Sequence, residues 1–363
     1  MLSEKFAGIT KFGKGKKGLI GLDIGSSRVK VIELKASGKG SYELISIGQV
    51  GLMADTIVDG QIIDGNHVSD CINRIFDDQG IKNDQIATSI SGHAVIIKKI
   101  SVPVMSNEEL REQIQWEAEQ HIPFDINDVN LDYHVIEGRE GDNMEVLLVA
   151  CKKDVVSQLT QVVSQAGKSP TVVDVDAFAM QNAYEVSYRP QPNEIVMLLN
   201  IGASFMSINI VRGTNSVFTR DISMGGNQYT DILQRELSLA FEQAEILKRG
   251  GEVEGSTVTF ADAVPFLDSV TEMLVSEVQR TLDFFYNQAS PDTEELSRIL
   301  VGGGCSKIHG LIQCLSERFR SPVETFNPFR SINVSPKKFD ENYIQEFAPD
   351  MAVAVGLALR NVD

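Results

Sequence analysis

Two short motifs with matching spacing have the residues needed to bind a polyphosphate. Residues 19–34 read LIGLDIGSSRVKVIEL, and residues 196–211 read VMLLNIGASFMSINIV. In each, an apolar run leads to Asp or Asn, then Ile-Gly, a small residue and Ser. Glycine lets the backbone bend sharply, so that successive N–H groups can point at one anion. Two such turns facing each other would hold a polyphosphate from both sides, whereas one alone could be a simple hairpin turn.

A third glycine cluster lies in residues 298–311, RILVGGGCSKIHGL. An apolar strand, Ile299–Val301, runs into the three glycines, and a helix is expected to begin near Ser306. Glycine-rich turns between a strand and a helix let a flat ring or a phosphate approach the backbone closely. The cluster is not a Walker loop, because the sequence contains no GxxxxGK[ST].

The fold that positions these turns must contain an internal structural repeat. The repeat predicts two lobes, each opening with a strand–turn–strand hairpin. Between them, residues 93–170 are typical of an inserted subdomain of order β-α-β-β-α, in which Ser106 and Glu109 form a capping box. The helices expected in the second half span residues 227–247, 270–286 and 351–359.

Composition and charge exclude several classes of protein. The 363 residues suffice for two separate cores. The net charge of −17 argues against nucleic-acid binding, because a phosphate backbone needs a basic surface. The four cysteines show no CxxC spacing, so we expect neither a disulfide framework nor a zinc site. No apolar run approaches the roughly 18 residues of a membrane span, and no signal-peptide core follows the first residues, so we expect a cytosolic protein.

Basic residues cluster at the start of the chain, where five lysines fall within residues 1–17. The simpler interpretation is a solvated tail interrupted by glycines. The alternative is a weak contact with anionic lipid or with an acidic partner.

Together the glycine motifs resemble those of the actin, sugar kinase and chaperone ATPase superfamily. Residues 23–27 with Lys30 are similar to its first phosphate motif, and residues 200–204 to its second. Residues 301–304 with Gly310 are similar to its adenosine motif. Three further segments resemble the nucleoside-binding helix (244–248) and the two connections between lobes (173–177 and 352–359).

Within that superfamily nearly the whole chain resembles the PilM family of type IV pilus assembly proteins. The family-specific stretches are QIQWEAEQHIPF (113–124), VVDVDAF (172–178), FTRDISMGGN (218–227) and NPF (327–329). The resemblance implies an α/β, actin-like (ribonuclease H-like) two-lobed ATPase fold with the inserted subdomain. The implied parts are the tail (1–17), the first lobe (18–92 with 171–195 and 346–363), the insert (93–170), the second lobe (196–226 with 291–345) and its extension (227–290).

The resemblance implies an ATP-binding adaptor with at most weak ATPase activity. Its partner would be the N-terminal cytoplasmic tail of PilN, an inner-membrane protein, with nucleotide state tuning that contact. The protein would then lie in the cytoplasm at the membrane face, with other pilus assembly proteins as further partners. The resemblance leaves open whether it forms a homo-oligomer. The alternatives are a filament-forming homologue of the related division protein FtsA, or a sugar or carboxylate kinase. For the kinase we find no motif for a catalytic base or a substrate pocket.

The resemblance also implies roles for individual residues. Asp23 would orient Mg²⁺ through water, and Lys30 would either contact phosphate or be an exposed strand residue. The residues implied in ATP binding are Asp23, Gly25, Ser26, Ser27, Lys30, Asn200, Gly202, Ala203, Ser204, Glu245, Lys248, Gly302, Gly303, Gly304 and Lys307. Those expected to help line the partner site, unless they are core residues, are Val95, Ile97, Ile122, Pro123 and Phe124.

One position departs from the family pattern. Asn200 stands where relatives usually have Asp, and an amide supplies no negative charge to a metal or to an attacking water. The candidate for positioning water is Asp176, where relatives often carry the longer Glu or Gln. We therefore expect ATP binding to be retained and hydrolysis to be slow or absent.

Overall fold

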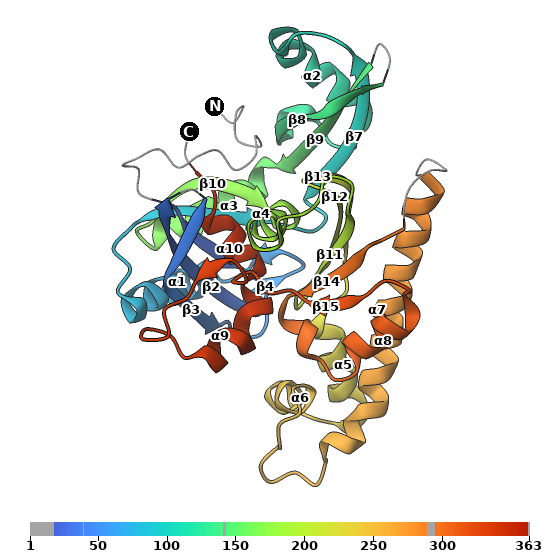
Figure 1. The fold of residues 1–363 in the computed structure, drawn as a ribbon. Coiled ribbons are helices and arrows are strands. Elements are labelled where there is room, and N and C mark those ends of the chain that lie inside the picture. The colour runs from blue at the N-terminus through green and yellow to red at the C-terminus, as the bar shows by residue number, and fades with distance from the viewer. Residues whose placement is uncertain (1–17, 39, 141–142, 289–294, 362–363) are drawn as a thin grey trace.

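Two β-sheets with helices between them form the core of the two lobes (Figure 1). The computed structural model describes residues 18–38, 40–140, 143–288 and 295–361, so the expected tail over 1–17 lies outside the described residues. The first sheet has the order β10-β6-β1-β2-β3-β16. Its strands are β1 (Ile20–Ile24), β2 (Arg28–Gly38), β3 (Ser41–Gly51), β6 (Gln85–Ile90), β10 (Ser169–Val175) and β16 (Ile332–Asn333).

The second sheet has the order β13-β12-β11-β14-β15. Its strands are β11 (Ile195–Ile201), β12 (Met206–Arg212), β13 (Asn215–Ile222), β14 (Arg298–Gly302) and β15 (Val323–Thr325). The helices are α1 (Gly65–Gln79), α2 (Asn107–His121), α3 (Lys153–Gln165), α4 (Asp176–Tyr188), α5 (Gly226–Leu237), α6 (Phe241–Lys248), α7 (Phe260–Gln288), α8 (Leu311–Arg318), α9 (Glu341–Phe347) and α10 (Ala352–Ala358).

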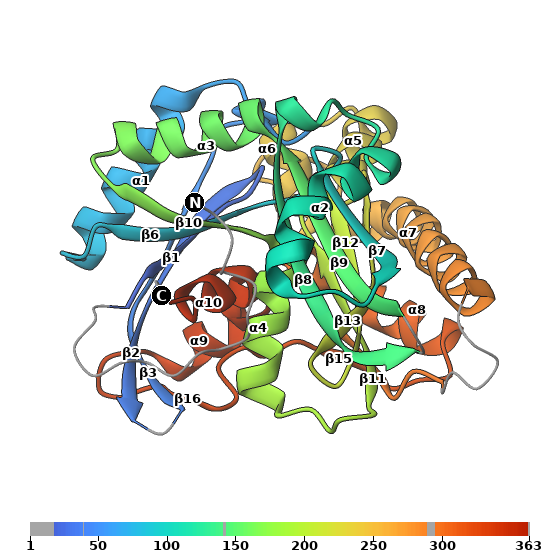
Figure 2. The same ribbon diagram turned by 90° about the horizontal axis from the view of Figure 1, so that it is seen from above.

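Each sheet is covered on both faces. Alternate apolar residues of β1 and β2 pack against α1 and α3, and the opposite side of the first sheet packs against α4 and α10. The same two helices contact β11 and β14 of the second sheet, whose other face packs against α5, α7 and α8. Helices α4 and α10 therefore lie between the lobes (Figures 1 and 2).

Two glycines permit the close approach of these central helices. A Cβ at Gly21 of β1 would lie 2.0 Å from the carbonyl oxygen of Ala354 in α10. A Cβ at Gly356 would lie 1.6 Å from the carbonyl oxygen of Ala179 in α4. Backbone atoms cannot yield as a flexible side chain can, so α10 reaches both β1 and α4 only because these positions lack side chains.

The predicted repeat is confirmed. Strands β1 and β2 form an antiparallel hairpin in which Asp23 pairs with Lys30, and β11 and β12 form another in which Asn200 pairs with Ser207. Both turns contain the same hydrogen bond, from Gly25 N to the Arg28 carbonyl (3.0 Å) and from Gly202 N to the Phe205 carbonyl (2.9 Å).

The insert has the predicted order β7 (Val95–Pro103), α2, β8 (Val129–Glu140), β9 (Asn143–Lys152) and α3. The capping box of Ser106 and Glu109 is present at the start of α2. The expected boundary at residue 170 needs correction, because the last helix, α3, packs on the first lobe. Its Leu159 and Val163 join the core that α1 forms on the first sheet. The three-stranded sheet and α2 alone form the projecting part (Figure 1).

Three other expectations were wrong. The helix expected over 227–247 is broken into α5 and α6, because Ser238 adopts a left-handed conformation (φ 52°) that ends the first helix. The helix expected near Ser306 begins at Leu311, after a short 3₁₀ turn and the left-handed Gly310. The segment assigned to the second lobe up to residue 345 includes β16, which pairs with β3 of the first sheet.

Candidate functional site

The two glycine turns differ from the expected cradle in one detail. The N–H groups of Gly25 and Gly202 are used inside their own turns, so donors for a phosphate must come from the residues that follow. These are Ser26 and Ser27 in the first turn and Ala203 and Ser204 in the second, at the positions implied by the family motifs.

Asp23 and Lys30 form a buried ion pair beside the first turn, with 2.8 Å between Asp23 Oδ2 and Lys30 Nζ. Burial alone would lower the pKa of Lys30, but the Asp23 carboxylate outweighs this effect and raises it. The Cβ missing at Gly25 would lie 3.9 Å from Asp23 Oδ1 and 4.0 Å from Lys30 Nζ. Glycine therefore leaves room for an anionic oxygen, or for an ion bound to one, next to both charged groups.

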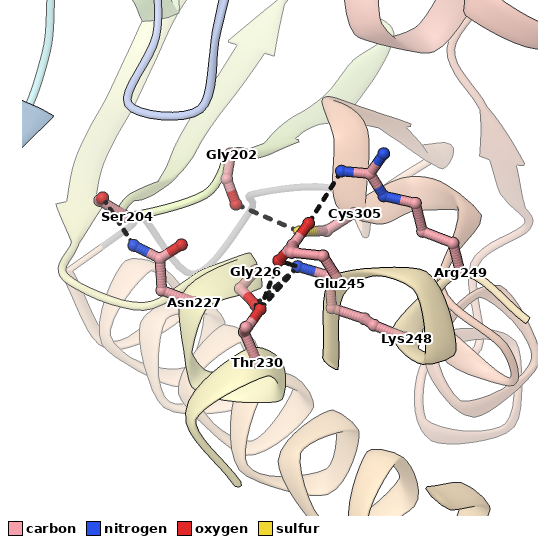
Figure 3. Close-up of polar contacts among 9 residues, drawn as sticks. All are labelled: Gly202, Ser204, Gly226, Asn227, Thr230, Glu245, Lys248, Arg249 and Cys305. Carbon is pink, nitrogen blue, oxygen red and sulfur yellow. Dashed lines mark hydrogen bonds and ion pairs between the residues drawn. The ribbon is translucent and has the colours of Figure 1, made fainter. Parts of the chain in front are cut away.

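The second turn is held against the start of α5 (Figure 3). Gly226 N donates to the Gly202 carbonyl (2.9 Å), Asn227 N donates to the Ala203 carbonyl (2.8 Å), and Asn227 Nδ2 donates to Ser204 Oγ (3.2 Å). The preceding Gly225 is required for this contact, because its Cβ would lie 2.4 Å from the Gly202 carbonyl oxygen. Gly225 and Gly226 were not among the candidate site residues, although the sequence FTRDISMGGN contains both.

Glu245 and Lys248 lie together near the end of α6 (Figure 3). Lys248 Nζ donates to Glu245 Oε1, to Thr230 Oγ1 (2.8 Å) and to the Gly226 carbonyl (3.2 Å). Burial would raise the pKa of Glu245, but the neighbouring Lys248 outweighs it and lowers the pKa. The pair thus joins α6 to the helix that supports the second turn, and Thr230 is the member of this group that sequence reasoning missed.

The third glycine cluster follows β14 and packs on the second connection between lobes. Gly303 has a left-handed φ of 84°, and its N–H donates to the Pro349 carbonyl (2.8 Å). A Cβ there would lie 2.8 Å from Asn200 Oδ1, which places this cluster beside the second motif. Gly302 is buried, whereas Gly304 is exposed and has open space where a Cβ would be. Lys307 Nζ lies 3.1 Å from the Asp350 carboxylate.

Two arginines that the sequence did not single out, one from each lobe, are close enough for their charges to interact. Arg28 follows the first turn and donates to Gln49 Oε1 (3.0 Å), while Arg249 follows α6 and donates to Glu245 Oε2 (2.8 Å). Burial and the charge of Arg249 together lower the pKa of Arg28. Each arginine directly adjoins a predicted site residue, and that adjacency was the signal available in the sequence.

Carboxylates from both lobes influence one another electrostatically near the start of α4. Burial and the Asp23 carboxylate raise the pKa of Asp176 to about 7, and the Asp221 carboxylate adds to this shift. The hydroxyls of Ser89 and Ser91, which hydrogen-bond Asp176, act in the opposite direction. Asp221, on β13 of the second lobe, was not predicted, because its distance from Asp176 depends on how the lobes pack.

The raised pKa of Asp176 predicts a pH-dependent stability. In the folded protein the Asp176 carboxyl keeps its proton up to about pH 7, whereas in the unfolded chain it keeps it only up to about pH 4. Ionisation of Asp176 therefore destabilises the fold increasingly between these two pH values. Asp176→Asn cannot ionise, and its stability relative to the wild type should increase by about 2–3 kcal/mol between pH 5 and pH 7.5 and then stay nearly constant. Urea unfolding at several pH values measures this difference. A difference that does not change with pH would contradict the prediction.

Asn200, Ser207 and Asp221 form one row across the second sheet. Asn200 pairs with Ser207, and Ser207 pairs with Asp221. Neighbouring residues of the same strands, Leu198 and Val211, pack against α4 and α10, so the row faces the first lobe. Ser207 Oγ is buried and has no hydrogen-bond partner among the described residues. A buried hydroxyl of this kind fits a ligand or a water at the site.

Within the described part of the chain, no three His, Cys, Asp or Glu side chains are grouped closely enough to hold a metal ion. Mg²⁺ bound with a nucleotide needs no such cage, because it keeps several waters and uses one or two carboxylates plus the phosphates. Asp23 fits that role, since Oδ2 holds Lys30 while Oδ1 lies next to the space left by Gly25.

The five candidate partner-site residues lie on opposite faces of the insert sheet. Val95 and Ile97 are half-buried and pack, together with Leu147, against the start of α4 at Val175 and Phe178. Ile122 is 5% exposed in the core under α2, and Phe124 packs against that same core. Pro123 is exposed beside them. Val95 and Ile97 therefore remain candidates for the partner site, whereas Ile122 is a core residue, the alternative left open for it.

Comparison with known proteins identifies relatives of this arrangement. The family described as type IV pilus assembly protein PilM matches residues 21–362. A solved PilM-PilN type IV pilus biogenesis complex is 29% identical, covers 94% of this chain and 98% of that chain, and superposes with a TM-score of 0.83.

Two further proteins are similar over part of the chain or in fold alone. The cell division protein FtsA of Bacillus subtilis (strain 168) is 25% identical over 255 residues, which are 63% of this chain and 57% of FtsA. MreB5 of Spiroplasma citri, solved with ADP, is 13% identical at a TM-score of 0.51, with 94% of this chain and 95% of that chain covered. The actin-like fold is therefore shown. None of the helices described here is long and apolar enough to cross a membrane.

Proposed function

The chain belongs to the PilM family of type IV pilus assembly proteins, and we propose that it is an ATP-binding adaptor for a PilN-type partner. The observation that carries this proposal is the pair of matching glycine turns, one on each sheet, with Asp23 and Lys30 beside the first. A protein whose two lobes each contribute such a turn can bind one polyphosphate between them and respond to it by a change in lobe position.

ATP would lie with its phosphates between the two turns. Residues 26–27 and 203–204 would donate backbone N–H groups, with Lys30 as a point charge. The adenosine would lie along Gly304, whose position is open, near Glu245 and Lys248. When bound, Mg²⁺ neutralises charge on the phosphates, and Asp23 would orient it through water.

Hydrolysis would be slow, because Asn200 cannot provide the carboxylate that relatives have at this position. Asn200→Asp should raise ATP turnover by about tenfold or more, since one general base contributes roughly 10²–10⁴-fold. The affinity for ATP should change by less than about threefold, because the turns that bind the phosphates are unaltered. Phosphate release and calorimetric titration measure the two quantities. Ser207→Asp places a carboxylate next in the same row and serves as a positional control. Unchanged turnover in a folded Asn200→Asp protein would show that hydrolysis is limited elsewhere.

The partner would be the N-terminal cytoplasmic tail of a PilN-type membrane protein, as the similarity to the PilM-PilN complex suggests. The face of the insert sheet that carries Val95 and Ile97 supports this proposal, because its side chains meet α4 near Asp176. A peptide bound there would place the protein at the inner membrane through its partner, and would contact the helix that starts beside the carboxylates.

Calorimetric titration with a synthetic PilN-type N-terminal peptide, with and without Mg-ATP, tests the adaptor function. We expect saturable binding that Ile97→Glu abolishes. Val104→Glu, at an exposed position of the insert, is the matched control and should leave binding intact. No binding in either nucleotide state would remove the adaptor proposal. Nucleotide-dependent light scattering would then test the FtsA-like filament, which the similarity to FtsA supports.

A further inference from the structure

We propose that Gly92 of the first lobe and His93 at the start of the insert, with Phe205, Asp221 and Ser223 of the second lobe, form an interlobe latch that couples ATP binding to the partner-binding face of the insert. This inference rests on the proposed function. It assigns a positioning role to five residues that are not among the predicted site residues, and it identifies the contacts and the chain segment that link the two binding sites.

The latch consists of contacts between residues more than 100 positions apart. Gly92 N donates to Asp221 Oδ2 at 2.6 Å, and His93 Nε2 lies 2.5 Å from Ser223 Oγ. The His93 ring meets Phe205 edge to face, with ring centroids 5.9 Å apart. Polar and aromatic contacts thus hold residues 92–93 to the end of β13 and to the second glycine turn.

Gly92 makes this close approach possible. Its φ of 82° lies in the left-handed region, and a Cβ would lie 2.8 Å from the Phe205 ring. Gly60, in the turn between the short strands β4 (Ile57–Val58) and β5 (Gln61–Ile62), meets the same ring, with its Cβ position 3.4 Å away. Phe205 therefore packs into two glycine positions of the first lobe, and it belongs to the second turn through the Gly202 hydrogen bond.

The segment that carries Gly92 connects three parts of the molecule. Upstream, Ser89 and Ser91 hydrogen-bond Asp176. Downstream, the Ala94 carbonyl accepts from Lys152 N at 3.3 Å, and β7 begins at the next residue. Val95 is therefore three residues from Gly92, and the peptide-binding face proposed above begins there. Movement of the second turn must either carry this segment along or break the latch.

This arrangement defines two states, one with the latch contacts held and one with them broken, which differ in free energy. A phosphate held by residues 203–204 fixes the turn, and with it the position of Phe205 against Gly92 and His93. A peptide on Val95 and Ile97 fixes the other end of the same segment. Each ligand then favours one arrangement of the latch, so each should change the affinity of the other by the same factor.

The test measures this factor. Peptide affinity is determined by calorimetry with and without saturating Mg-ATP for the wild type, His93→Ala and Phe205→Ala. We expect a wild-type factor of about 10, within the usual range of such couplings, and a factor below about 2 in both variants. His309→Ala is the matched control, because His309 forms the same edge-to-face contact with Phe260 (5.5 Å) inside the second lobe. Its factor should equal that of the wild type.

The outcomes separate the latch from the proposed function. If the wild type binds neither ATP nor peptide, the adaptor proposal fails. If it binds both with no coupling, or if the coupling persists in His93→Ala and Phe205→Ala, the latch proposal is overturned while the adaptor remains. A merely structural role for these residues would lower both affinities equally and leave their coupling factor unchanged. A double-mutant cycle of His93→Ala and Ser223→Ala locates the interaction at that contact.

Discussion

Replacing Asp23 by alanine is expected to weaken the binding of Mg-ATP by about 10- to 100-fold, the usual effect of removing a charged hydrogen-bonding group. The carboxylate lies beside the first glycine turn and would orient the waters of Mg²⁺. It also holds Lys30 at 2.8 Å, so its loss leaves that ammonium buried without its counter-charge. Calorimetric titration with ATP in the presence and absence of Mg²⁺ separates these two contributions.

The Mg²⁺-free titration should give a different result. Without Asp23, Lys30 is available to the phosphates and one negative charge is gone, so affinity for ATP alone should stay equal or increase. Glu194→Ala is the control for breaking a partly buried ion pair, because Glu194, just before β11, pairs with Arg298 at 2.7 Å. Unaltered Mg-ATP affinity in Asp23→Ala would remove Asp23 from the site.

Replacing Gly356 by alanine should reduce the free energy of unfolding by at least about 3 kcal/mol, the upper end of the usual effect of overpacking. The added Cβ would lie 1.6 Å from the Ala179 carbonyl oxygen, so α10 and α4 must separate. Both helices also pack on the two sheets, and their separation would disturb the cores of both lobes. Urea unfolding measures the loss directly.

Gly51→Ala is the matched control for this change. Gly51 lies at the end of β3 with open space where its Cβ would be, so its substitution should be nearly neutral. A Gly356→Ala protein within about 0.5 kcal/mol of the wild type, the range of ordinary surface substitutions, would show that α10 can shift at no cost. The junction between the lobes would then be looser than its packing indicates.

The parts predicted best were those determined by local spacing. The hairpins at Gly25 and Gly202 were predicted because an apolar run followed by a glycine turn occurs twice with the same spacing. The capping box of Ser106 and Glu109 was equally local. Both features depend on residues at most a few positions apart, and the structure confirms them.

Predictions failed where contacts between residues far apart in the sequence determine the structure. The left-handed Ser238 splits one expected helix into two, and nothing in its neighbours marks that position. Helix α3 has an apolar face typical of any packed helix, and the choice between the insert and the first sheet is made by the partners available to it. Ile122 was expected either to line the partner site or to be a core residue, and the packing at the end of α2 makes it a core residue.

By itself, the sequence determined the two lobes, the glycine turns and the family, because repeats and motif spacing are written along the chain. Only the tertiary structure decided which residues interact between the lobes: Asp221 with Asp176 and Arg28 with Arg249 through their charges, and Phe205 with Gly92 by packing. The physical reason is that interactions between charges and rings depend on distance in space. Packing sets that distance for residues far apart in sequence, and no local pattern encodes it.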